Sequence, residues 1–155
     1  MTLSSMNMVP PSVLLVDDEV SFVETLAKRI AKRGLKVEAA LSGREALDKL
    51  DAGGGASAFD VVILDVKMPG MDGLETLAAI KLKHPNIEVI MLTGHATVES
   101  AIDGMRAGAY DYLMKPCEIN LLMAKIDRSV RKKREHEEKI LEAKAQLIAL
   151  RRGMD

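Results

Sequence analysis

Residues 61–73 read VVILDVKMPGMDG, a short apolar run that ends at Asp65 and continues into a turn rich in glycine and proline. Such a run, dominated by β-branched residues, is typical of a parallel strand buried on both faces. Glycine and proline then favour a tight loop directly beside Asp65. The segment therefore predicts a carboxylate at the carboxyl end of a strand, which is where ligands bind in open α/β sheets.

Outward from this segment, short apolar runs alternate with helical patterns over residues 12–131. Strands are expected at residues 13–16, 36–40, 61–64, 88–92 and 110–114, and helices at residues 21–33, 42–50, 74–83, 97–107 and 119–130. Five such units with right-handed crossovers predict a doubly wound α/β sandwich, (βα)5, whose parallel five-stranded sheet has the order 2-1-3-4-5.

Polar residues follow four of the expected strands, at the point where each apolar run ends. They are Asp17 with Asp18, then Asp65, Thr93 and Lys115. Because the carboxyl ends of parallel strands meet at one edge of the sheet, these side chains are expected to converge. Three neighbouring carboxylates repel one another unless a cation compensates, and oxygen ligands alone favour Mg2+. The sequence therefore predicts a magnesium site.

Asp65 has two possible roles in such a site. It is either a metal ligand only, or the nucleophile that takes up a phosphoryl group as an aspartyl phosphate. Lys115 and Thr93 favour the second role, because a transferring phosphoryl group carries charge on its equatorial oxygens and needs fixed donors besides the metal.

Four motifs in this order resemble the receiver domains of two-component response regulators. They are LLVDDE at residues 14–19, VILDVKMPGMDG at 62–73, VIMLTG at 89–94 and AGAYDYLMKP at 107–116. The resemblance covers about residues 12–131 and implies a flavodoxin-like, CheY-like fold.

The resemblance also implies a chemistry. Asp65 would accept a phosphoryl group from a histidine kinase or a phosphotransfer protein. Asp17, Asp18, Asp65 and the backbone carbonyl of Lys67 would hold Mg2+, and Lys115 would contact the phosphoryl oxygens. Such a chain is a phosphoacceptor switch and not an enzyme acting on external substrates.

By the same resemblance, Thr93 and Tyr112 would form the switch pair. Their movement would bias the face formed by the fourth helix, the fifth strand and the fifth helix, expected at residues 97–107, 110–114 and 119–130. That face would bind a downstream protein or a second copy of the chain. The resemblance further suggests a cis peptide bond before Pro116.

The rest of the chain divides into short flanking segments. Residues 1–11 are expected to be a flexible leader, residues 12–131 the receiver domain and residues 132–155 a charged helical extension. In the extension, apolar residues recur at positions 140, 143, 147 and 150, which is barely two heptads. A solvated continuation of the last helix is favoured over a coiled coil.

Composition excludes several other classes. The net charge is only -1, and too few residues follow residue 131 for a helix-turn-helix reader, so no direct nucleic-acid binding is expected. No apolar run approaches the roughly 20 residues of a membrane span. Cys117 is the only cysteine of the chain, which agrees with a reducing, cytoplasmic location.

Two alternatives remain open from the residues. A phosphatase of the haloacid-dehalogenase type also uses an aspartate nucleophile with Mg2+, but its first strand ends in an Asp-x-Asp-x-Thr/Val pattern, where this chain reads DDEVS at residues 17–21. The other alternative is the receiver part of a longer regulator with an output domain. A stand-alone receiver is the favoured reading.

Overall fold

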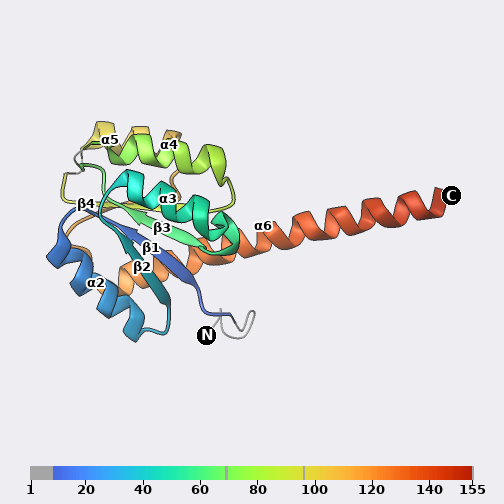
Figure 1. Ribbon diagram of the computed structural model, residues 1–155, viewed down its shortest axis with the longest axis horizontal. Helices are drawn as coiled ribbons and strands as arrows, with labels where there is room; N and C mark the ends of the chain where they lie inside the picture. The colour runs from blue at the N-terminus through green and yellow to red at the C-terminus, as the bar shows by residue number, and fades with distance from the viewer. Residues whose placement is uncertain (1–8, 69, 96, 155) are drawn as a thin grey trace.

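The computed structural model describes residues 9–68, 70–95 and 97–154. In this part of the chain five parallel strands form one sheet of order β2-β1-β3-β4-β5, which confirms the predicted fold (Figure 1). The strands are β1 (Ser12–Val16), β2 (Lys36–Ala40), β3 (Val61–Leu64), β4 (Glu88–Thr93) and β5 (Asp111–Met114). Each strand lies where the apolar pattern places it.

Helices cover both faces of this sheet. They are α2 (Val20–Lys32), α3 (Gly43–Gly53), α4 (Gly73–Lys83), α5 (Val98–Arg106) and α6 (Ile119–Met154), with a short 3-10 turn η1 (Gly55–Ser57) after α3. Figure 1 shows α3, α4 and α5 on one side of the sheet, and α2 with the first part of α6 on the other. The predicted output face corresponds to α5, β5 and the first turns of α6.

Consecutive residues of a strand point to opposite faces, so each strand feeds two apolar cores. The core beneath α3 and α4 includes Leu14, Val62, Leu64, Met91, Leu47, Leu50, Leu77 and Ile80. The core beneath α2 and α6 includes Val13, Leu15, Ile63, Ile90, Val23, Ile30, Leu122 and Ile126. Burial on both faces explains why β1, β3 and β4 read as unbroken apolar runs.

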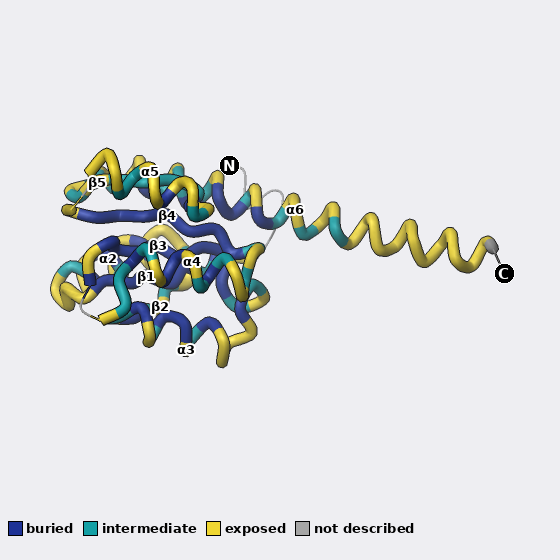
Figure 2. Tube along the Cα trace, turned by 90° about the horizontal axis from the view of Figure 1, so that it is seen from above, coloured by how far each residue is buried: buried dark blue, intermediate teal, exposed yellow. Residues whose placement is uncertain are grey.

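The last helix, α6, continues without a break across the expected domain boundary at residue 131. Its first half packs on the sheet, and every residue from 141 to 150 is exposed (Figure 2). No helix among the described residues combines the length and the apolar character needed to cross a membrane. Of the expected leader, residues 1–8 lie outside the described residues, while Pro11 is buried and its carbonyl accepts a hydrogen bond from Lys36 N at 2.9 Å.

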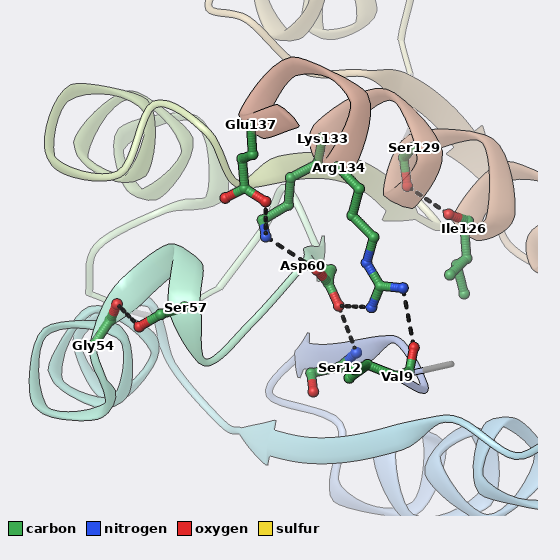
Figure 3. Close-up of polar contacts among 10 residues, drawn as sticks. All are labelled: Val9, Ser12, Gly54, Ser57, Asp60, Ile126, Ser129, Lys133, Arg134 and Glu137. Atoms are coloured by element: carbon green, nitrogen blue, oxygen red, sulfur yellow. Dashed lines mark hydrogen bonds and ion pairs between the residues drawn. The ribbon is translucent and has the colours of Figure 1, made fainter. Parts of the chain in front are cut away.

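A buried ion cluster joins α6 to the end of the sheet opposite Asp65. Asp60, directly before β3, accepts hydrogen bonds from Lys133 Nζ at 3.0 Å, Arg134 Nη2 at 3.1 Å and the backbone N–H of Ser12 at 2.9 Å (Figure 3). Burial alone would raise the pKa of Asp60, but these donors outweigh burial and lower it below 3.8.

Replacing Asp60 with asparagine is expected to lower the free energy of unfolding by about 3 kcal/mol at pH 7, because the buried charge of Lys133 would lose Asp60 and keep only the partly exposed Glu137 as an acidic partner. Since the folded-state pKa of Asp60 is depressed, its stabilisation is complete above pH 3.8 and is lost as the pH falls through that lower pKa. Urea unfolding over a pH series measures the difference in the free energy of unfolding between wild type and Asp60→Asn. If this difference does not become smaller in acid, the depressed pKa of Asp60 is contradicted.

Candidate functional site: an acidic cluster at the carboxyl ends of the strands

The three predicted carboxylates meet at one point. Asp17, Asp18 and Asp65 each offer an oxygen, and these oxygens lie within 4.8 Å of one another. The parallel register that pairs Val16 with Leu64 causes this, because the residues that follow both strands then emerge side by side. Asp17 and Asp65 are only 1% and 3% exposed, whereas Asp18 is open to solvent.

The amine of Lys115 lies inside this cluster. Its Nζ donates hydrogen bonds to Asp17 Oδ2 at 2.6 Å and Glu19 Oε1 at 3.1 Å, and it lies 4.0 Å from Asp65 Oδ2. Burial opposes the charge, but the hydrogen bonds to the two acids outweigh it, so the pKa of Lys115 is raised. The peptide bond between Lys115 and Pro116 is cis, as the resemblance suggested.

Lys115 does not fully compensate the negative charge of the three carboxylates. Desolvation raises the pKa of Asp17 despite its hydrogen bond from Lys115. In the described part of the chain, the buried Oδ1 of Asp65 has no hydrogen-bond partner. Buried carboxylate oxygens are almost always paired or bound to a metal. The oxygen-only donor set and the unpartnered atom therefore fit a divalent ion of the magnesium type.

The loop after β3 is held tightly against Asp65. A Cβ at Gly73 would lie 2.1 Å from the carbonyl oxygen of Asp65, so only glycine permits this approach. The Gly73 N–H donates to Val66 O at 2.7 Å, and Asp72 caps α4 in a capping box with Glu75. Lys67 follows Asp65 by two residues in this loop. Pro69, part of the predicted turn, lies outside the described residues.

The two predicted switch residues occupy neighbouring strands. Thr93 at the end of β4 is fully buried, and its hydroxyl accepts a hydrogen bond from His95 N at 3.0 Å. Tyr112 in β5 is half-buried, and its hydroxyl lies 2.6 Å from Ser100 Oγ on α5. Each hydroxyl thus has a local partner, and the second contact links β5 to α5.

A hollow lies beside these residues, between the loop after β3 and the start of α5. It is lined by Val66, Lys67, His95, Thr97 and Ser100. Lys67 and His95 follow Asp65 and Thr93 by two residues each, so side chains from two different loops border one opening.

Sequence reasoning missed three groups that touch the predicted residues. Glu19 binds Lys115, the ring of Phe22 lies 4.1 Å from the Lys115 amine, and Ser100 binds Tyr112. Glu19 directly follows the two predicted acids, which could have signalled its role. Phe22 and Ser100 carry no such signal, because one reads as an apolar helix position and the other as part of a helix cap.

A doubly wound sheet of this order, with an acidic cluster at the carboxyl ends of its strands, defines a CheY-like receiver of the flavodoxin-like class. Residues 13–127 match the family described as response regulator receiver domain. The chain belongs to this family of two-component signalling proteins.

Relatives and solved structures agree with this assignment. The chain is 36% identical over 118 residues to the transcriptional regulatory protein ZraR of Escherichia coli K12, which covers 76% of this chain and 26% of ZraR. It is 38% identical over 116 residues to the DNA-binding transcriptional regulator NtrC of Klebsiella pneumoniae, covering 75% of this chain and 24% of NtrC. The chain thus spans about a quarter of the length of these curated relatives.

Among solved structures, a receiver domain protein from Clostridium thermocellum superposes with a TM-score of 0.75 at 33% identity, over 80% of this chain and 97% of the other. The receiver domain of NtrX from Brucella abortus gives a TM-score of 0.70 at 32% identity, over 77% of this chain and 98% of the other.

Proposed function

We propose that this chain is a phosphorylation-dependent switch in which Asp65 accepts a phosphoryl group from a phosphohistidine of a kinase or phosphotransfer protein. A carboxylate oxygen of Asp65 attacks the phosphorus while the bond from phosphorus to the donor nitrogen breaks. The observation that carries this proposal is the buried, unpartnered Oδ1 of Asp65. The same carboxylate lies beside those of Asp17 and Asp18, and its Oδ2 is 4.0 Å from the Lys115 amine.

The surrounding residues have separate tasks in this reaction. Asp17, Asp18, Asp65 and the backbone carbonyl of Lys67 would hold Mg2+, which would supply positive charge to the phosphoryl oxygens. Lys115, already near Asp65, provides a second positive charge on the protein itself. The Thr93 hydroxyl would donate a hydrogen bond to the phosphoryl oxygens.

The switch would use the contacts already present around Thr93 and Tyr112. A phosphoryl group on Asp65 would accept a hydrogen bond from the Thr93 O–H and so favours movement of this hydroxyl toward the site. Space released near β4 then favours an inward turn of Tyr112, at the cost of its hydrogen bond to Ser100. Phosphorylation would therefore shift the equilibrium of α5 and β5 from the arrangement in which Tyr112 contacts Ser100 to the one in which Tyr112 is turned inward.

The face formed by α5, β5 and α6 has the composition of a protein-binding surface. Its exposed large apolar side chains are Val98, Ile102, Met105, Met114 and Leu121. Exposed apolar side chains on neighbouring elements support a role of this face in protein binding. A downstream protein or a second copy of the chain would bind here.

Other parts of the proposal rest on the sequence. The chain acts in the cytoplasm and has no turnover chemistry beyond its own phosphorylation and dephosphorylation.

Labelling stoichiometry separates a receiver from a phosphatase. With Mg2+ and excess acetyl phosphate, the full chain is expected to take up one phosphoryl group per molecule, because one buried aspartate has a free oxygen for attack. Intact-protein mass spectrometry measures the uptake, and free-phosphate release from a phosphate monoester measures turnover. Steady turnover of the monoester without a labelled protein would favour the phosphatase instead.

A further inference from the structure

Lys133 is a buried lysine within the charged residues 131–139 of α6. The side chain of Lys133 is 3% exposed, whereas that of its neighbour Lys132 is 63% exposed and contacts Glu88 at 3.4 Å. Lysines are almost never buried without a partner, because the charge loses its hydration. Lys133 is accordingly paired with Asp60 at 3.0 Å and with Glu137 at 3.1 Å.

The cluster around Asp60 joins three segments that are distant in sequence. Arg134 donates one hydrogen bond to Asp60 and another, at 3.0 Å, to the carbonyl oxygen of Val9, while Ser12 N–H donates to Asp60 (Figure 3). The chain leading into β1, the residue before β3 and the middle of α6 therefore meet at one carboxylate.

This junction lies where α6 leaves the domain. Glu137 and Ile140 are the last half-buried residues of the helix, and the residues from Leu141 to Leu150 are all exposed. Figure 2 shows the helix projecting from the domain beyond this point. Because residues 141–150 are all exposed, the direction of the projecting part depends on how firmly the preceding turns are held.

We propose that Asp60, with Lys133 and Arg134, is an anchor that fixes the direction and rotation of α6, so that the projecting helix moves with the domain as a rigid arm. A rotation of α6 about its axis would break the contacts that Lys133 and Arg134 make with Asp60. Short isolated helices are marginal in water, so residues 138–154 also depend on the anchored turns as a helical seed. The anchor is independent of the chemistry at Asp65.

The test compares buried and exposed lysines at adjacent positions. The full chain, with Cys117→Ser, carries spin labels at Lys28→Cys on α2 and Lys144→Cys on the projecting helix; both native side chains are exposed. Wild type and Lys132→Met are expected to give one narrow distance distribution. The double variant Asp60→Asn/Lys133→Met, which removes both buried charges together, is expected to give a broader one.

Hydrogen exchange provides a second readout that does not use labels. Amides of residues 131–141 are expected to exchange at least about tenfold faster in the double variant, while amides of β1 and β4 stay protected. Arg134→Gln, which keeps the Lys133–Asp60 pair, is expected to give a smaller change of the same kind. An unchanged distance distribution and unchanged exchange in the double variant would overturn the anchor, as would equal broadening in Lys132→Met.

Discussion

Asp65→Asn is expected to reduce phosphoryl labelling of the full chain by acetyl phosphate to the background level. The amide oxygen that replaces the carboxylate is a poor nucleophile, and the substitution preserves the shape of the side chain. The amide is also neutral, so the acidic cluster would lose one of the negative charges that attract a divalent cation. Labelling is measured by intact-protein mass spectrometry at a fixed time and donor concentration.

The chain offers a matched control for this substitution. Asp60 is also a buried aspartate and lies at the other end of the same strand, β3. Asp60→Asn is expected to retain labelling under conditions where it remains folded, because it lies far from the acidic cluster in the sheet. Labelling of Asp65→Asn at the wild-type level would remove Asp65 from the phosphoacceptor role, and equal loss in both variants would point to a general defect.

Removal of Mg2+ is expected to slow labelling by about a thousandfold, since a Lewis acid supplies several kcal/mol of charge stabilisation to phosphoryl transfer. The fold should survive, because the two apolar cores and not the acidic cluster hold the sheet together. Without the metal the three carboxylates repel one another, but Lys115 offsets part of their negative charge, so we expect the domain to stay folded.

Labelling with and without chelator, together with circular dichroism of the same samples, measures both effects. Readdition of Mg2+ is the control, and it should restore labelling at once. Unfolding on chelation would make the metal a structural component, and labelling that proceeds unchanged without it would remove the metal from the reaction.

The fold and the convergence of the acids could be predicted because they depend on local signals. The apolar runs before Asp17, Asp65 and Thr93 specify buried strands, and parallel order places the following residues at one edge. The start of α3 is also readable, because serine followed by glutamate three residues later is a typical helix start, and here the Ser42 hydroxyl accepts a hydrogen bond from the Glu45 N–H at 3.1 Å.

The environment of Lys133 could not be predicted, because it depends on a partner 73 residues away. A run of charged residues reads as a solvated helix face, and nothing near Lys133 distinguishes it from Lys132. The same limit applies to Phe22, whose contact with the Lys115 amine arises only when α2 is packed beside the end of β5. Contacts of this kind are determined by tertiary packing and not by periodicity.

The most direct test of the account is to locate the phosphoryl group on the labelled wild-type chain. Borohydride reduces an acyl phosphate to an alcohol, so reduction followed by peptide mass spectrometry identifies the modified residue. The account predicts that position 65 alone is converted to homoserine. Conversion at Asp17 or Asp18, or a phosphoryl group recovered on His95, would contradict it.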